Sequence, residues 1–268
     1  ISRQTPGPIP GSGADPTHPA LVAEMQSFMQ QQDFSMGVAW DGDCDRCVFF
    51  DEQGKLVPTY YIVGLLAEMF LQAEPGGSVV FDTKLCMNTL EIIERYGGVP
   101  VPSKTGHAFM KQQMQNSNAV YGGELSSHHY FGQFFGCDSG MIAWLTMLQL
   151  LNERADPLSV LVDVRRQQFC CTPEISVVLQ DVDAAFDKVL NLWGNKALET
   201  DHLDGISLTM PGDWRFSIRR SKTEPVVRLN FEAKGDPRNL LQEGPAVLEE
   251  LSAFRADDAD WLARFVIQ

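Results

Sequence analysis

The stretch GSVVFDTKLCMNTLEIIERYGGVPVPSKTGHAFMKQQMQNSNAVYGGE, residues 77–124, decides the fold. Short apolar runs of strand character alternate in it with longer segments whose apolar residues recur at helical spacing. The runs and segments lie at 77–83, 85–97, 99–104, 106–116 and 118–124. Strands that alternate with helices are typical of an α/β domain with a mostly parallel sheet.

The same alternation extends on both sides of this stretch. We expect further helices near 19–32 and at 60–73 and 141–153, and short strands at 36–40 and 47–50. The two short strands flank an acidic loop. The sequence therefore predicts a mixed, mostly parallel α/β fold up to about residue 172.

The pattern changes near Thr172 and Pro173. Beyond this point strands gather with few helices between them, which is typical of an α+β domain. We expect a separate, small α+β C-terminal domain over 173–268. Its expected elements are strands at 174–181, 205–210, 214–219 and 226–234, and helices at 183–194 and near 237–253.

Composition narrows the class of protein. The chain has 268 residues, 44% of them hydrophobic, and a formal net charge of −14. This charge argues against binding of nucleic acid or of an anionic membrane, although a cleft on an acidic protein can be locally positive. No apolar run reaches the roughly 18 residues of a membrane span, and no signal peptide is visible. Because the first residue is Ile1, we expect a processed product or a fragment.

The cysteines indicate a reducing compartment. Cys44 and Cys47 form a C-x2-C pair, but no second pair lies at the distance of a zinc ribbon. Most of the six cysteines lie in apolar or strand-like surroundings, where a thiol behaves as a small hydrophobic group. We expect free thiols and a cytoplasmic protein.

The acidic loop DGDCDR, residues 41–46, is the strongest chemical signal. Alternate residues of an extended loop point the same way, so Asp41, Asp43 and Asp45 can converge on one hard cation. Three carboxylates suit Mg²⁺, which keeps further positions for water or phosphate oxygens. Arg46 beside them is suited to holding a phosphate.

Two other interpretations of this loop compete. One is a solvated acidic turn, since carboxylates are common in turns. The other is an EF-hand, in which Asp41, Asp43, Asp45 and Glu52 would occupy positions 1, 3, 5 and 12. Position 6 of that loop needs glycine for a sharp turn, and Arg46 stands there. The flanks are also strand-like, so a calcium-binding interaction protein is disfavoured.

A second polar loop, GGELSSHHYF, spans residues 122–131. Glu124, Ser126, His128 and His129 gather hydrogen-bond donors and acceptors there, which suits the hydroxyls of a sugar. Loops beyond the carboxyl ends of strands are where α/β domains place ligands. The alternative is an ordinary loop whose histidines make structural hydrogen bonds.

A third motif, RRSKTEP, spans residues 219–225 between two expected strands. Arginine, hydroxyl groups and backbone N–H groups in one turn can cradle a phosphate. The alternative is a basic turn exposed to water. Lys84 in FDTK and His107 in SKTGH are weaker candidates, since each alone is more often a surface or helix-start residue.

The order and spacing of these motifs resemble the α-D-phosphohexomutase family. Its members carry a DGDxDR metal loop, a GEMS-type sugar loop and an RxSNTEP-type phosphate loop, and the resemblance runs from roughly residue 19 to 253. GGELSSHHYF together with CDSGMIAW is similar to the phosphomannomutase branch, some members of which also accept glucose phosphates. Leu125 stands where phosphoglucosamine mutases usually have Gln, and Lys222 where Asn is usual.

The resemblance implies a role for each matching residue. The implied Mg²⁺ ligands are Asp41, Asp43 and Asp45, and the implied residues of the catalytic cleft are Arg46, Lys84 and His107. The implied sugar-binding residues are Glu124, Ser126 and His128. The implied phosphate-binding residues are Arg219, Ser221, Lys222 and Thr223.

The resemblance also implies an activity. Members of the family interconvert hexose 1-phosphates and hexose 6-phosphates through a phosphoserine enzyme and a hexose 1,6-bisphosphate, with Mg²⁺ as cofactor. We therefore expect a phosphomannomutase/phosphoglucomutase with a phosphosugar substrate and no nucleic-acid or membrane partner. The oligomeric state and the choice between mannose and glucose phosphates stay open.

One departure from the family pattern is large. The family has four domains, and its nucleophilic serine lies in a T-A-S-H-N/P-like motif of the first, whereas no serine here has such surroundings. The resemblance implies that the chain corresponds to the end of domain two, a partial α/β domain over 1–55, and to all of domains three and four, over 56–172 and 173–268. We also expect it to be inactive alone, so that a phosphosugar-binding fragment without turnover is the alternative function.

Overall fold

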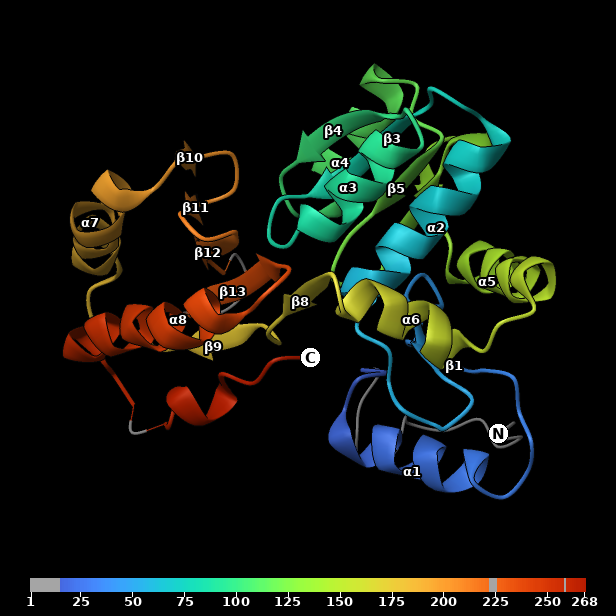
Figure 1. The fold of residues 1–268 in the computed structure, drawn as a ribbon, viewed down its shortest axis with the longest axis horizontal. Coiled ribbons are helices and arrows are strands. Elements are labelled where there is room, and N and C mark those ends of the chain that lie inside the picture. The colour runs from blue at the N-terminus through green and yellow to red at the C-terminus, as the bar shows by residue number, and fades with distance from the viewer. Residues whose placement is uncertain (1–14, 222–225, 258) are drawn as a thin grey trace.

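The protein folds into three units that follow one another along the chain (Figure 1). The computed structural model describes residues 15–221, 226–257 and 259–268. In Figure 1 the C-terminal unit lies on the left, the central unit at the upper right and helix α1 below it. The expected mixed α/β fold with a small α+β C-terminal part is confirmed.

A five-stranded sheet with the order β4-β3-β5-β6-β7 forms the centre. Strand β3 pairs in parallel with β4 and β5, while β6 and β7 add antiparallel pairs at one side. The strands are β3 (Ser78–Asp82), β4 (Val99–Ser103), β5 (Tyr121–Gly123), β6 (His129–Phe131) and β7 (Cys137–Asp138). The loops that follow the parallel strands therefore open at one edge of the sheet.

Helices cover both faces of this sheet. Side chains alternate along β3, so Val79 and Phe81 pack on the face covered by α2, and Val80 packs on the other face with Met110 and Met114 of α4. Helix α2 is buried on nearly all sides because α3, α5 and α6 also pack against it. The helices are α2 (Thr59–Ala73), α3 (Met87–Arg95), α4 (His107–Asn116), α5 (Gly140–Arg154) and α6 (Leu158–Arg166).

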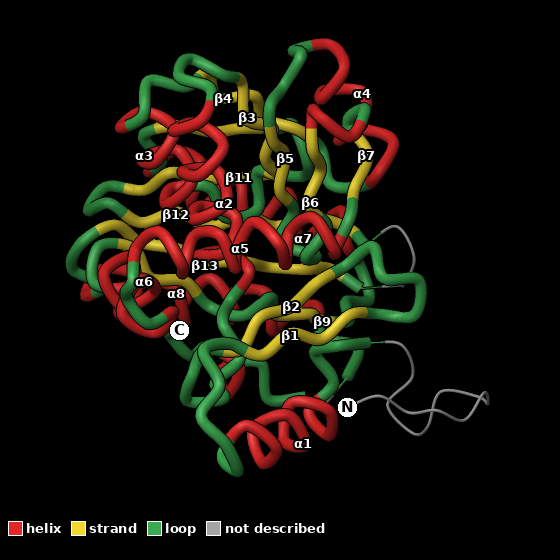
Figure 2. The backbone as a smooth tube through the Cα atoms, turned by 90° about the vertical axis from the view of Figure 1, so that its right-hand side faces the viewer, coloured by secondary structure: helices red, strands yellow, loops and turns green. Residues whose placement is uncertain are grey.

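The N-terminal unit is a hairpin packed on one helix, and Figure 2 shows α1, β1 and β2 together at the bottom of the molecule. Strands β1 (Gly37–Trp40) and β2 (Cys47–Phe50) pair antiparallel, and α1 (Pro19–Met29) covers them. Alternation along β2 turns Cys47 and Phe49 toward the core of the central unit. The hairpin thus presents its acidic loop to the central sheet.

The C-terminal unit is an antiparallel sheet with two helices. Its strands follow the order β10-β11-β12-β13-β8, and β9 also pairs with β13. Side chains of both helices join the apolar core of this sheet. The elements are β8 (Phe169–Cys171), β9 (Ile175–Val177), α7 (Val182–Trp193), β10 (Glu199–Asp201), β11 (Ile206–Met210), β12 (Trp214–Arg220), β13 (Val227–Lys234) and α8 (Arg238–Leu251).

Among the α-helices and strands that the structure describes, five lie outside those predicted from the sequence: β6, β7, α6, β8 and β10. The four strands have two or three residues each, too few for an alternating pattern. Helix α6, LSVLVDVRR, contains three valines, whose branched side chains favour strands. Since β8 pairs with β13, the C-terminal sheet begins at Phe169, ahead of the expected boundary after residue 172.

A buried carboxylate joins the C-terminal sheet to the central unit. Glu232 of β13 is fully buried and accepts hydrogen bonds from the Tyr60 hydroxyl at 2.8 Å and from the backbone N–H of Cys86 and Met87 at 2.8 and 2.9 Å. These N–H groups begin α3, so Glu232 caps that helix from another unit. Arg215 of β12 lies 3.2 Å from Glu232 and balances its charge.

The same contact fixes the loop that follows β3. Arg215 donates hydrogen bonds to the carbonyls of Thr83 and Lys84 at 2.6 and 3.1 Å, and Ser217 donates to the Lys84 carbonyl at 3.2 Å. The backbone of Lys84 is therefore held by the C-terminal sheet, although Lys84 belongs to the central unit.

All six cysteines are free thiols. Burial raises the pKa of the Cys47, Cys86 and Cys171 thiols, so they remain protonated and serve as packing groups. Among the described residues, no helix has the length and apolar character needed to cross a bilayer.

Substitution Glu232→Gln should strongly destabilise the protein. It leaves Arg215 buried without its partner charge, and breaking a buried ion pair from one side costs about 3–5 kcal/mol. Chemical denaturation measures this loss. The exposed ion pair between Asp236 and Arg238 provides the control, since Asp236→Asn should leave stability unchanged. Equal stability of the two variants would contradict the role of Glu232.

Candidate functional site

Loops from all three units meet around one cavity of about 520 Å³. The acidic loop 41–46, the loop after β3, the loop between β5 and β6 and the end of β12 all reach it. The polar side chains that line it include Arg46, Lys84, Ser126, Arg219, Ser221 and Arg228. All but Arg228 are residues predicted from the sequence.

The three aspartates of the acidic loop converge as expected. Asp41, Asp43 and Asp45 each offer one carboxylate oxygen, and these oxygens lie within 4.8 Å of one another. Cys44 between them has a positive φ of 64°, a turn that brings Asp43 and Asp45 to the same side. Asp41 is buried, Asp45 is half-buried and Asp43 is exposed.

Arg46 organises the charge of this loop. Its Nε donates to Oδ2 of Asp41 at 2.6 Å and its backbone N–H donates to Oδ1 at 3.1 Å. Burial favours the neutral carboxyl, but the hydrogen bonds from Arg46 outweigh it and lower the pKa of Asp41. At Asp45, burial and the charges of Asp41 and Asp43 raise the pKa, against the opposing effect of His128.

This donor set fits a magnesium ion. All three ligand groups are hard carboxylate oxygens, and the exposed side at Asp43 leaves room for water or phosphate oxygens. A divalent cation would also relieve the repulsion that raises the pKa of Asp45.

The acidic loop is tied directly to the loop 124–128. Arg46 and His128 form an antiparallel β-bridge, and the N–H of Cys47 donates to the carbonyl of Ser127 at 3.3 Å. The hydroxyls of Thr59 and Ser127 lie 2.7 Å apart. Two segments some eighty positions apart in sequence therefore form one rigid wall of the cavity.

Within the loop 124–128, the predicted residues differ in exposure. Ser126 lines the cavity, and its Oγ lies 2.8 Å from Nδ1 of His128. Glu124 is only 1% exposed and accepts hydrogen bonds from the N–H of Gly106 at 2.7 Å and from the Tyr130 hydroxyl at 2.6 Å. His129 points away from the cavity and is buried, with its Nδ1 2.7 Å from the Tyr121 hydroxyl.

Lys84 reaches the cavity from a buried position. Its Nζ lies 3.5 Å from Oδ2 of Asp82, which also accepts a hydrogen bond from the N–H of Leu125 at 2.8 Å. Burial raises the pKa of Asp82, and the positive charge of Lys84 opposes this shift. Asp82 thus connects the loop after β3 to the loop 124–128.

Two arginines and one glutamate form the far end of the cavity. Glu174 accepts from Arg219 at 3.2 Å and from Arg228 at 2.7 Å. Burial favours the neutral form of Glu174, but the charges of Lys84, Arg219 and Arg228 lower its pKa. Ser221 lines the cavity beside them. Lys222 and Thr223, predicted for the same motif, lie outside the described residues.

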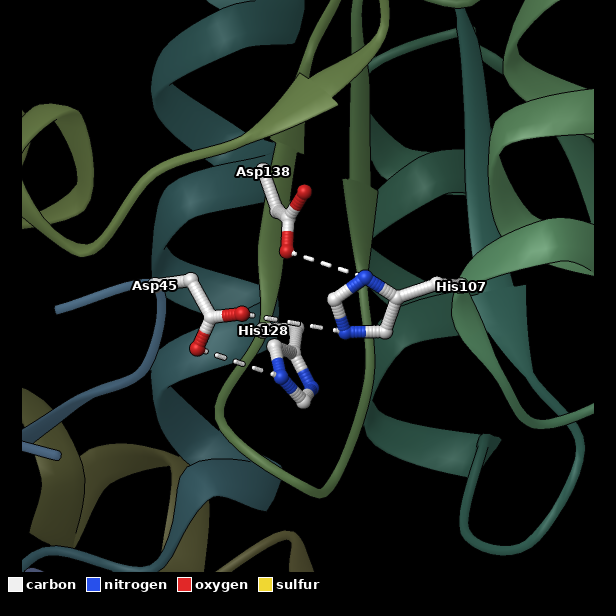
Figure 3. Close-up of side chains that lie close together, drawn as sticks. All are labelled: Asp45, His107, His128 and Asp138. Carbon is white, nitrogen blue, oxygen red and sulfur yellow. Dashed lines mark ion pairs between the residues drawn. The ribbon is translucent and has the colours of Figure 1, made fainter. Parts of the chain in front are cut away.

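His107 lies beside the acidic loop, in the group drawn in Figure 3. Its ring stands between Asp138 and Asp45, at 3.3 and 4.0 Å, and His128 lies 3.5 Å from Asp45. Burial lowers the pKa of His128 to about 4, and the neighbouring His107 adds to the shift. Lys111 pairs with Asp138 at 2.8 Å.

Several residues of the site were not predicted from the sequence. Glu174 and Arg228 lie inside expected strands. Charged residues at alternate positions of a strand ordinarily indicate only a face exposed to water. Gly140 begins α5, and a Cβ there would lie 2.8 Å from the carbonyl of Cys44, so α5 seats the acidic loop closely. Asp138 and Gly140 lie in CDSGMIAW, the segment that is similar to the phosphomannomutase branch, so the sequence did contain a signal for these two residues.

Comparison with known proteins agrees with this geometry. Residues 58–169 match the model for phosphoglucomutase/phosphomannomutase α/β/α domain III, and residues 172–250 match the model for the C-terminal domain of the same family. The chain therefore belongs to the phosphoglucomutase/phosphomannomutase family.

Individual relatives are similar over nearly the whole chain. A protein of Xanthomonas campestris pv. campestris named "Phosphohexose mutases" is 44% identical over 88% of this chain and 52% of its own length. A phosphomannomutase of Escherichia coli K12 is 44% identical over 86% of this chain and 50% of its own. The chain spans about half the length of the curated relatives it matches.

Solved structures share the fold. A phosphoglucomutase/phosphomannomutase family protein from Burkholderia thailandensis has a TM-score of 0.77 at 28% identity, over 91% of this chain and 52% of its own. An N-acetylphosphoglucosamine mutase of Aspergillus fumigatus, solved with GlcNAc-6P and magnesium, has a TM-score of 0.59 at 14% identity, over 81% of this chain and 48% of its own.

Substitution Glu174→Gln should destabilise the protein in a pH-dependent way. Because the folded-state pKa of Glu174 is lowered, the carboxylate stabilises the fold above its ordinary pKa of 4.5, and this contribution is lost as the pH falls through the folded value. We expect a loss of about 1.5 kcal/mol at pH 7 and a smaller loss at pH 3, measured by denaturation.

The exposed Glu199 supplies the control, since Glu199→Gln should change little at either pH. An equal loss at both pH values for Glu174→Gln would contradict its pairing with the two arginines.

Proposed function

We propose that this chain forms the phosphosugar-binding part of a phosphomannomutase/phosphoglucomutase, which interconverts hexose 1-phosphates and hexose 6-phosphates. One observation carries the proposal: Arg46 of the acidic loop, Ser126 of the loop 124–128 and the arginine pair Arg219 and Arg228 line one cavity of about 520 Å³. The three-aspartate cluster adjoins this cavity through the ion pair of Asp41 with Arg46. The names of the relatives support a mutase of this class.

The arginine end binds the phosphate that is not reacting. Arg219 and Arg228 supply charge-assisted donors, and Ser221 adds a hydroxyl. Glu174 now accepts from both arginines, so a phosphate must compete with it for them. The Nε of Arg219 is buried and has no hydrogen-bond partner among the described residues. A phosphate that displaces Glu174 would also satisfy this donor.

The loop 124–128 recognises sugar hydroxyls that are common to both substrate orientations. Ser126 offers its hydroxyl directly to the cavity. Glu124 has both oxygens engaged, so it acts either by exchanging the Gly106 N–H for a hydroxyl or by holding the loop in shape. Lys84 lines the cavity and positions the sugar, and His128, whose ring is neutral at pH 7, adds a ring nitrogen 2.8 Å from the Ser126 hydroxyl.

The acidic loop serves the reacting phosphoryl group. Asp41, Asp43 and Asp45 would hold Mg²⁺, which neutralises charge on that group. Arg46 adds a fixed positive charge beside it, and His107 lies within reach to accept or return the hydroxyl proton. The magnesium present in the fungal mutase structure supports this assignment.

We further propose that the nucleophile is a phosphoserine outside this sequence. Its phosphorus–oxygen bond would break as the free hydroxyl of a hexose phosphate attacks, giving a hexose 1,6-bisphosphate and a serine hydroxyl. After reorientation the other phosphoryl group returns to serine. No serine in the chain lies in the family's motif, and the curated relatives are about twice as long. The cytoplasmic location stays a prediction.

The second candidate function is phosphosugar binding without turnover. It is favoured by the presence of the phosphate end and the sugar loop in one chain, since these suffice for binding but supply no nucleophile.

The chain alone should bind hexose phosphates but not convert them. Incubation with mannose 1-phosphate, Mg²⁺ and a hexose 1,6-bisphosphate should yield no mannose 6-phosphate, because phosphoryl transfer lacks its nucleophile. Steady turnover by a chain whose intact mass is verified would place the nucleophile within this sequence and contradict the proposal.

Substitution Arg219→Ala should weaken binding of mannose 6-phosphate about tenfold or more, since a hydrogen bond to a charged group contributes about 1.5–3 kcal/mol. Isothermal titration calorimetry measures the affinity. The neighbouring Arg220 is the matched control, because it is exposed and pairs with Asp183 on α7. Equal affinity of Arg219→Ala and Arg220→Ala proteins would exclude Arg219 from the binding site.

A further inference from the structure

Four side chains from four different segments meet beside the acidic loop. Asp45 comes from the β1–β2 loop, His107 from the start of α4, His128 from the residue before β6 and Asp138 from β7 (Figure 3). One potential ligand atom of each lies within 4.8 Å of the others. The closest pairs are 3.3 Å for His107 with Asp138 and 3.5 Å for His128 with Asp45.

Two of these separations are close to those of a four-coordinate metal site. With metal–ligand bonds of about 2.0–2.2 Å, neighbouring ligands of a tetrahedral zinc ion lie about 3.3–3.6 Å apart. His107 presents Nδ1 to Asp138 at 3.3 Å and Nε2 to Asp45 at 4.0 Å, so its ring, on a side chain 41% exposed, must turn to offer one nitrogen to the metal.

Neighbouring groups orient the ligand atoms toward the centre. Lys111 pairs with Oδ1 of Asp138, which leaves Oδ2 facing His107. That Oδ2 is buried, on a side chain only 7% exposed, and accepts no hydrogen bond among the described residues. Ser126 lies 2.8 Å from Nδ1 of His128, so Nε2 is the nitrogen directed at Asp45. Such outer contacts are typical of metal-binding histidines and carboxylates.

We propose that Asp45, His107, His128 and Asp138 form a second metal site, which binds Zn²⁺ or a related first-row transition metal rather than Mg²⁺. Two imidazole nitrogens and two carboxylate oxygens suit these metals, whereas Mg²⁺ prefers oxygen ligands alone. The site differs from the three-aspartate cluster in donor type and shares only Asp45 with it.

Sharing Asp45 makes the two sites compete. A zinc ion on the histidines withdraws one of the three oxygens from the acidic loop, so Zn²⁺ should weaken Mg²⁺ binding. It also occupies His107 and His128, to which the proposed function gives roles in proton transfer and sugar binding. Zn²⁺ is therefore expected to inhibit the full-length enzyme. This second part of the inference depends on the proposed Mg²⁺ assignment, while zinc binding does not.

Isothermal titration of Zn²⁺ into the chain tests the site. We expect one zinc ion per chain and a loss of affinity of about tenfold or more in both His107→Gln and His128→Gln proteins. His202→Gln is the control, because His202 is exposed on the C-terminal unit. His107 is partly exposed, so its variant should unfold at the same temperature as the wild type without metal.

Two results would overturn the site. Wild-type zinc affinity in the His107→Gln protein would exclude the histidine cluster, and loss of binding in a Cys44→Ser protein would move the zinc to the exposed thiol of the acidic loop.

Titration of Mg²⁺ with and without bound Zn²⁺ tests competition, with a tenfold weakening of Mg²⁺ affinity expected. Unchanged Mg²⁺ affinity refutes the competition. Failure of the zinc-free chain to bind Mg²⁺ at all refutes the proposed magnesium function instead.

Discussion

The buried carboxylate of Glu232 is the contact on which the arrangement of the site depends. It caps helix α3 of the central unit from a strand of the C-terminal sheet, and Arg215 compensates its charge while holding the carbonyls of Thr83 and Lys84. A fully buried charge must keep its partners, because loss of one leaves the free-energy cost of removing the charge from water uncompensated. The groups around Glu232 can therefore move little. Lys84 and the arginine end of the cavity are therefore fixed relative to each other.

A second set of contacts joins the remaining loops. Asp82 connects the loop after β3 to the N–H of Leu125, and the bridge between Arg46 and His128 connects that loop to the acidic one. The N–H of Thr105 donates to Asp204 of the C-terminal unit at 3.1 Å, which adds another contact between the central and C-terminal units. The proposed phosphoryl transfer requires charges that are placed rigidly in advance, because positioning and electrostatics supply most of the acceleration of such a reaction.

Much of the fold and two loops of the site could be predicted from the sequence, for two reasons. In residues 77–124 the spacing of apolar residues is clearly different in the strands and in the helices, so the alternating elements of the central unit could be predicted from this spacing. The alternating aspartates singled out the loop at 41–46, and the polar loop at 122–131 stood out because ligand-binding loops in such folds follow strand ends. What the sequence did not reveal depends on pairing in space. Glu174 and Arg228 become partners only when β9 and β13 pair, and the contacts that engage Glu124 come from α4 and β6. Strands of two or three residues are set by such pairing rather than by local preference.

The central claim is that these loops bind one phosphosugar, with its phosphate at the arginine end. A crystal structure of the chain grown with mannose 6-phosphate and Mg²⁺ tests it most directly. The account predicts a phosphate within hydrogen-bonding distance of Arg219 and Arg228, and a sugar ring whose hydroxyls face Ser126. A fully occupied phosphosugar elsewhere on the protein, with both arginines still closed on Glu174, would contradict it.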